Sequence, residues 1–108
     1  MIVVTTSQVQ GYRVTRTLGL VRGNTIRTKH VGKDIVAMLR YLVGGEVREY
    51  TKMFAQSREQ AIDRMIEEAR ALGADAVLTT RFQTSKIMSG ASEILCYGTA
   101  VTLEPVED

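Results

Sequence analysis

The sequence predicts a single α+β domain over residues 1–108, with two helices packed on one face of a mostly antiparallel β-sheet. Apolar and polar residues alternate in three segments, 12–25, 76–88 and 93–103, as they do in half-buried strands. Between the first and second of these segments the apolar residues recur at helical spacing instead. A chain of 108 residues suits one hydrophobic core and is too short for two ordinary ones.

The first two expected strands lie near the N-terminus. Residues 1–6, MIVVTT, form a short β-branched run, and the alternating segment 12–25 follows Gly11. Gly19 lies inside this second strand, where a missing side chain is typical of a bulge or a close backbone approach. The alternation places Tyr12, Val14, Leu18 and Leu20 on one face of the strand and Arg13, Thr15 and Thr17 on the other.

The first expected helix lies in the segment 30–45, HVGKDIVAMLRYLVGG. Its apolar residues Ile35, Leu39 and Leu42 recur at helical spacing. The pair Gly44 and Gly45 supplies the backbone freedom that a helix C-terminus needs. We therefore expect this helix to end there.

The second expected helix runs from about residue 47 to residue 72, because its apolar phase is unbroken from Tyr50 to Leu72. Gly73 follows the last periodic residue, as a left-handed C-cap requires, and Asp75 lies in the turn. Phosphate-binding loops have the opposite order, strand then glycine then helix, so we interpret this turn as structural.

The two C-terminal segments are expected to form an antiparallel hairpin. The segments 76–88 and 93–103 alternate and are separated by the small-residue turn SGAS. The predicted element order is therefore β-β-α-α-β-β.

Composition excludes several classes of protein. Fourteen basic and twelve acidic residues are interspersed along the chain, which argues against a nucleic-acid-binding block. Only six residues are aromatic, and Tyr12, Tyr50, Phe54 and Phe82 fall on apolar stripes, so we expect no nucleic-acid partner. No apolar run approaches the roughly 18 residues of a membrane span, and the N-terminus lacks signal-peptide features. We expect a cytoplasmic protein without membrane contact.

The residues offer no catalytic constellation and no confident cofactor or metal site. Soft metals need two or three thiolate or imidazole ligands, and this chain has one cysteine, Cys96, and one histidine, His30. Cys96 is in phase with Ile94 and Ala100, which favours a buried structural thiol, and His30 precedes the first helix beside Lys29. A Cys96–His30 dyad is not expected, so we predict that the protein is not an enzyme.

The polar face of the sheet is the more informative feature. It is expected to hold Arg13, Thr15, Thr17, Thr79, Arg81, Gln83 and Thr99, together with the apolar Tyr97, Val101 and Leu103. Such a mixed face suggests contact with another subunit, and Gly98 suits a close approach between strands or subunits. Arg13 and Arg81 are the candidates for contacting an anionic ligand, and a solvated face without ligand is the alternative.

Together these segments resemble the YbjQ-like family, which is labelled as heavy-metal-binding. The similarity covers nearly the whole chain and is most specific in VGG at 43–45, YT at 50–51, GADAV at 73–77, TS at 84–85 and YGTAV at 97–101. The resemblance implies a dodecin-like α+β subunit that assembles into a ring, most often a pentamer and sometimes two stacked rings, with no established catalytic activity.

Three functions are compatible with these observations. The leading one is a non-enzymatic homo-oligomer that binds a small ligand or ion between subunits. The alternatives are a heavy-metal-binding or metal-response protein using Cys96 and His30, and a structural or protein-interaction module without a ligand. Subunit contacts or structural roles are expected for Gly44, Gly45, Gly73, Asp75, Tyr97, Gly98, Thr99 and Val101. A metal ion is implied by the resemblance alone.

Overall fold

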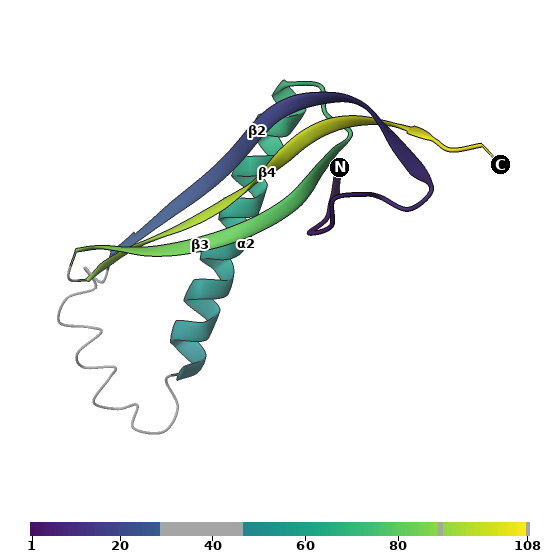
Figure 1. The fold of residues 1–108 in the computed structure, drawn as a ribbon. Helices are drawn as coiled ribbons and strands as arrows, with labels where there is room; N and C mark the ends of the chain where they lie inside the picture. Colours follow the sequence, from purple (N-terminus) through teal and green to yellow (C-terminus); the bar gives the residue numbers. More distant parts are fainter. Residues whose placement is uncertain (29–46, 89, 108) are drawn as a thin grey trace.

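A computed structural model describes residues 1–28, 47–88 and 90–107, which form a four-stranded sheet and one helix (Figure 1). The elements are β1 (Ile2–Val3), β2 (Tyr12–Thr28), α2 (Val47–Ala71), β3 (Ala76–Met88) and β4 (Ala91–Pro105). The strand order in the sheet is β1-β3-β4-β2. Strand β4 pairs antiparallel with both long strands, β2 and β3, whereas β1 pairs in parallel with β3.

The α+β class is confirmed, and two finer predictions change. The sheet is mixed, because β1 pairs in parallel with β3 across all the intervening elements. The order β-β-α-α-β-β is not matched, since the described residues contain one helix, and the helix expected at 30–45, with Gly44 and Gly45, lies outside them. Sequence periodicity identifies strands and leaves their partners open, so it gave no sign of the parallel pair.

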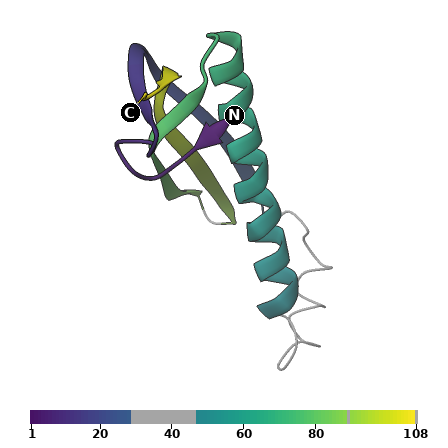
Figure 2. The same ribbon diagram turned by 90° about the vertical axis from the view of Figure 1, so that its right-hand side faces the viewer.

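Helix α2 covers one face of the sheet, which we call the helix face, and packs mainly over β2 and β4 (Figure 2). Ala61, Met65 and Ala69 lie four residues apart on α2 and are fully buried. Their sheet partners in the core are Val21, Val77, Ile94, Cys96 and Ala100. Gly23 lets β2 approach the helix closely, because an added Cβ would lie 2.1 Å from the carbonyl oxygen of Ala61.

The opposite face carries a second, smaller core at one end. Ala76, Leu78 and Val101 are buried there against the N-terminal segment that includes Ile2 and Val4. Backbone amides of this segment bond to the sheet, with Ile2 donating to the Asp75 carbonyl at 3.2 Å and Val4 donating to the Val77 carbonyl at 3.0 Å. One end of this face is therefore covered by the chain's own N-terminal segment.

Two irregularities in β2 change which residues share a face. The register with β4 shifts between Val14 and Arg16 and again between Thr17 and Gly19. The second shift confirms the bulge expected near Gly19, whose φ is 124°. As a result, Thr17 lies opposite Val101 on the second core's face, while Leu18 packs against the helix-side core. The simple alternation predicted for this strand is therefore wrong between the two bulges, because the first inserted residue reverses the phase. The second inserted residue restores it, so Leu20 lies on the same face as Val14.

Candidate functional site

The sheet face opposite α2 is open beyond the second core, and we call this open part the free face. Among the described residues, no helix packs on it, and Leu20 and Ile26 of β2 are 64% and 56% exposed there. Cross-strand register places nine further side chains with them. These are Arg22 and Asn24 of β2, Arg81, Gln83 and Ser85 of β3, and Glu93, Leu95, Tyr97 and Thr99 of β4.

The centre of the free face is a row of three residues, Arg22, Tyr97 and Arg81, which we call the Tyr97 row. Tyr97 on β4 pairs with Arg22 on one side and with Arg81 on the other. Neighbouring strands are about 4.8 Å apart, so the two arginine Cα atoms are about 10 Å from each other. Both arginines are exposed and Tyr97 is half-buried. The row therefore presents one positive charge on each side of an aromatic ring.

The orientation of Arg81 depends on a bulge in β3. The register with β4 shifts between Leu78 and Arg81, and Thr79 has a positive φ of 54°, which is unusual for a β-branched residue. The N-terminal segment holds this bulge, because the amides of Thr79 and Thr80 donate to the carbonyls of Thr6 and Val4 at 2.9 and 3.0 Å. Without the inserted residue, Arg81 would lie on the helix face.

Arg81 is also held through its guanidinium. Its Nη1 donates to the carbonyl oxygens of Thr5 and Thr80, both at 2.9 Å. Gly98 lies opposite the bulge, where an added Cβ would come within 2.5 Å of Val77 Cγ1. The close approach at Gly98 is thus between two strands of one chain. The Thr80 hydroxyl is buried beside it and has no hydrogen-bond partner among the described residues.

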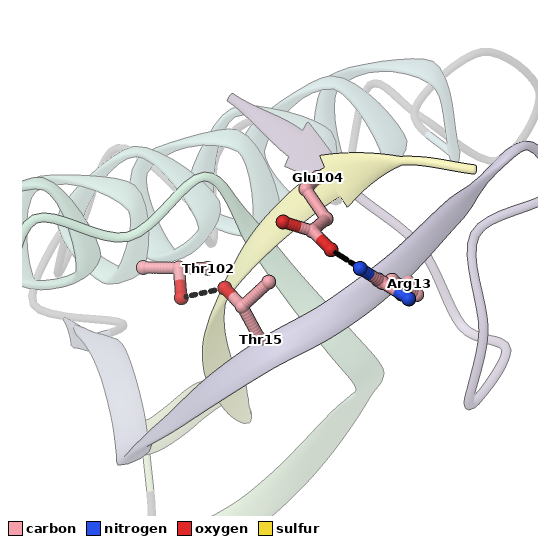
Figure 3. A network of polar contacts seen from close by, with 4 residues as sticks. All are labelled: Arg13, Thr15, Thr102 and Glu104. Atoms are coloured by element: carbon pink, nitrogen blue, oxygen red, sulfur yellow. Dashed lines mark hydrogen bonds and ion pairs between the residues drawn. The ribbon is translucent and has the colours of Figure 1, made fainter. Parts of the chain in front are cut away.

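Arg13, the other predicted anion-binding residue, lies in a different place (Figure 3). It pairs with Glu104 across β2 and β4, with 71% of the Arg13 side chain exposed, and Thr15 and Thr102 share a 2.6 Å hydroxyl contact beside it. Glu104 is seven positions from Tyr97 along β4, which corresponds to about 23 Å. Within one chain the structure therefore does not bring Arg13 and Arg81 together.

The two soft-metal candidates are not brought together either. Cys96 is fully buried, its Sγ lies 3.6 Å from Met65 Sδ, and His30 lies outside the described residues. Burial raises the pKa of the Cys96 thiol, which opposes the thiolate that binds metal. The described ranges contain no group of three His, Cys, Asp or Glu side chains suited to a metal ion. This donor set does not fit a thiolate-rich heavy-metal site.

Several predicted structural residues have positions within the subunit. Gly73 ends α2 with a φ of 80°, and the amide of Ala74 donates to the Ala69 carbonyl at 3.0 Å. The Asp75 carboxylate accepts a hydrogen bond from the Leu103 amide at 2.8 Å. Val101 is 1% exposed in the second core, so it contributes to packing within the chain. Thr99 is half-buried on the free face beside the Tyr97 row.

Arg22 is the residue that sequence reasoning missed. The prediction grouped Arg81 with the face of β2 that holds Arg13, whereas the register with β4 joins Arg81 to the opposite face, which holds Arg22. Arg22 is in phase with Leu20 in the sequence, but periodicity within one strand does not show which face of the next strand it joins.

A family model and similar proteins relate this chain to one family. A YbjQ family model described as "Putative heavy-metal-binding" matches residues 1–104. A UPF0145 protein from Methanococcus vannielii is 57% identical over 104 residues, covering 96% of this chain and 99% of the relative. A UPF0145 protein from Thermus thermophilus is 56% identical over 108 residues, covering 100% of this chain and 95% of the relative. Neither name states an activity.

A solved structure shares the fold. It is a protein of unknown function from Pediococcus pentosaceus assigned to the DUF74 family, with a TM-score of 0.64 and 18% identity, covering 96% of this chain and 98% of that one. In the part of the chain that the structure describes, no helix combines the length and apolar character that a membrane span needs.

Proposed function

Because the chain belongs to the YbjQ family, we propose that it acts as a non-enzymatic homo-oligomer, a ring of subunits joined through the edges of their sheets. The observation that carries this proposal is the 17-residue strand β2, which pairs with β4 on one side and, among the described residues, has no strand on the other. An open edge of this length presents unpaired amides and carbonyls to another chain.

The second edge of the sheet is also largely open. Strand β1 pairs with β3 only at Ala76 and Val77, so most of the 13 residues of β3 have no strand on their outer side among the described residues. The two open edges differ, so their pairing is heterologous and closes a ring when the rotation between subunits permits it. A pentamer, or a decamer of two rings, is the expectation from the family resemblance.

Exposed apolar residues support the same conclusion. Leu20 and Met88 are 64% exposed, and Phe82 on the helix face of β3 is 46% exposed because α2 lies mainly over β2 and β4. The Cα radius of gyration is 17.9 Å, against about 13 Å for a compact domain of this length. An extended subunit of this kind buries little of its own apolar surface, and neighbouring subunits would supply the missing contacts.

The ligand of the proposed assembly is better described as an anion bound by Arg81 than as a metal ion. Arg81 is oriented by two backbone carbonyls and keeps its remaining N–H groups for an anion. Heavy-metal binding through Cys96 is a weaker proposal, because the thiol is buried beside a thioether and has no second thiolate within the described residues. The same isolation of Cys96 supports the absence of nucleophilic catalysis.

Native mass spectrometry of the untagged protein tests the assembly and any retained ligand in one measurement. We expect a ring-sized oligomer for the parent protein. Leu20→Lys introduces a charge at the exposed edge strand and should shift the mass toward monomer while leaving the far-UV circular dichroism unchanged. Leu72→Lys is the matched control, because Leu72 is 48% exposed just beyond the end of α2 and lies on no strand.

The outcomes separate the possibilities. A monomeric parent protein at micromolar concentration would refute the edge-pairing proposal. Equal dissociation by Leu20→Lys and Leu72→Lys would show that general destabilisation, and not the β2 edge, controls assembly. An oligomer that carries stoichiometric metal, retained in Cys96→Ala, would shift the function to metal binding at ligands other than this thiol.

A further inference from the structure

We propose that the Tyr97 row binds single-stranded nucleic acid, with one base stacked on Tyr97 and the phosphates on either side of that base contacting Arg22 and Arg81. The proposal goes beyond oligomeric assembly and does not depend on ring size. Edge pairing uses the backbone groups of the outer strands, so it does not require the side chains of the Tyr97 row, and the two proposals are compatible.

The aromatic ring is placed as a stacking platform requires. Tyr97 is half-buried on the free face, in the middle strand of the three long ones. The next row along the strands consists of Asn24, Leu95 and Gln83, so two side-chain amides lie beside the ring. Sheets that bind single strands use an exposed aromatic residue for stacking and nearby polar groups for the edges of the base.

The electrostatics of the row favour an anionic partner. Arg22 has no hydrogen bond or ion pair to any described residue, although it is exposed at the centre of the free face. Strand β2 contains four arginines and no acidic residue. Neither row adjacent to the Tyr97 row contains a carboxylate, and Glu93, two rows away, accepts a hydrogen bond from Asn24 at 3.0 Å.

Arg81 is prepared to bind phosphate. Its two backbone hydrogen bonds both use Nη1, so the N–H groups of Nε and Nη2 remain available to an anion. Because the bulge and the N-terminal segment fix the position of its backbone, less side-chain freedom is lost when it binds. A planar guanidinium also matches phosphate geometry better than an ammonium group would.

The arrangement of the three residues favours a nucleic-acid strand over other anions. A nucleotide inside a strand has a phosphate on each side of its base, and the row has an arginine on each side of its aromatic ring. A free nucleotide has phosphate on one side only, and an acidic peptide lacks the ring that stacks. The expectation from sequence that no nucleic acid binds rested on interspersed charges and on the few aromatic residues, four of which were assigned to apolar stripes, whereas Tyr97 was assigned to the mixed face of the sheet.

Fluorescence anisotropy with labelled 12-mer oligo-dT and oligo-U tests the proposal. We expect salt-dependent binding, and Tyr97→Ala should weaken it on the order of 10-fold while Tyr97→Phe retains it, because stacking needs the ring and not the hydroxyl. Arg22→Gln should weaken binding and reduce the magnitude of the slope of log K against log salt by about 0.7 per row, the value for one phosphate contact on a single strand.

Arg16→Gln is the matched control. Arg16 is exposed on the same strand and has no partner among the described residues, but its register with Thr102 places it on the helix face. The charge change is identical to that of Arg22→Gln, so this variant should bind like the parent protein apart from a small general effect of net charge.

Four results would overturn the proposal. The first is no oligonucleotide binding by a protein whose native mass confirms its oligomer, and the second is an equal loss of affinity in Arg16→Gln and Arg22→Gln. The third is displacement of the oligonucleotide by dextran sulfate together with unchanged affinity in Tyr97→Ala. The fourth is equally effective displacement by a free mononucleotide at the same nucleotide concentration. The first leaves the assembly proposal intact, because native mass is measured on the same sample. The last would assign the row to a small ligand.

Discussion

The substitution Gly23→Ala tests how β2 and α2 pack. An added Cβ at position 23 would lie 2.1 Å from the Ala61 carbonyl oxygen, 2.4 Å from the Met65 amide nitrogen and 2.9 Å from Arg64 Cβ. Two of these three neighbours are backbone atoms, which cannot move without moving the helix. Gly23 has no positive φ, so the expected effect is steric and not conformational.

The magnitude follows from the displacement that the methyl group requires. The closest contact is about 1.3 Å short of the 3.4 Å at which ordinary contacts begin, so α2 must move outward by about that amount. A gap of 0.5 to 1 Å already removes roughly a quarter to a half of the dispersion energy of the atoms that it separates. Since Val21, Met65 and Cys96 pack at this contact, we expect the free energy of unfolding to fall by about 3 kcal/mol, the upper end of the range for an overpacked core.

Urea unfolding followed by the circular dichroism of α2 measures this loss. With an m-value of about 2 kcal/mol/M, the midpoint should fall by about 1.5 M. The parent and the variant must be compared at one protein concentration, because oligomerisation makes apparent stability concentration-dependent. Arg22→Ala, one residue earlier on the free face, is the control and should change stability by no more than about 0.5 kcal/mol. A Gly23→Ala midpoint within 0.25 M of the parent's, an order-of-magnitude limit of about 0.5 kcal/mol, would refute this packing.

Two further predictions concern buried polar atoms. Thr80→Val removes a buried hydroxyl without a partner among the described residues and keeps the side-chain shape, so we expect stability to be unchanged or raised by up to about 1 kcal/mol, and a loss above about 1 kcal/mol would reveal a missed hydrogen bond. Burial raises the pKa of the Cys96 thiol above its ordinary value of 9.0, so the folded state binds more protons above that pH and stability should fall as the pH rises further. Cys96→Ala should remove this part of the pH dependence, and identical slopes for parent and variant above pH 9, as measured by urea midpoints, would contradict the burial.

Much of the fold could be predicted because local patterns specify it. The apolar repeat of α2 predicted a helix at about 47–72, and the structure has Val47–Ala71. The alternating segments on either side of SGAS predicted the hairpin of β3 and β4, and Gly73 ends α2 with a positive φ. These features depend on residues within a few positions of each other, so periodicity and turn chemistry are sufficient.

The candidate site was less predictable. Arg81, Tyr97 and Thr99 were assigned to one polar face, and the structure places Arg81 and Tyr97 in one row of the free face and Thr99 in the next. Arg13 and Thr15 were assigned to that face as well, but the pairing of Arg13 with Glu104 places them on the helix face, at the far end of the sheet. The two insertions in β2 cancel, so Arg13 and Arg22 lie on opposite faces as simple alternation requires, and only the register with β4 shows which of these faces Arg81 shares.

The sequence by itself determined the class of the domain, the long helix, the hairpin and the family, because each depends on local periodicity or on quoted motifs. Only the tertiary structure decided that β1 lies in parallel beside β3, that Gly23 makes room for α2, and that Arg22 and Arg81 are on either side of Tyr97. The physical reason is that strand partners and register are set by contacts between residues far apart in the sequence and by bulges, which local periodicity does not locate. The row proposed to bind nucleic acid is made of one residue from each of three strands, so it exists only when those strands are paired.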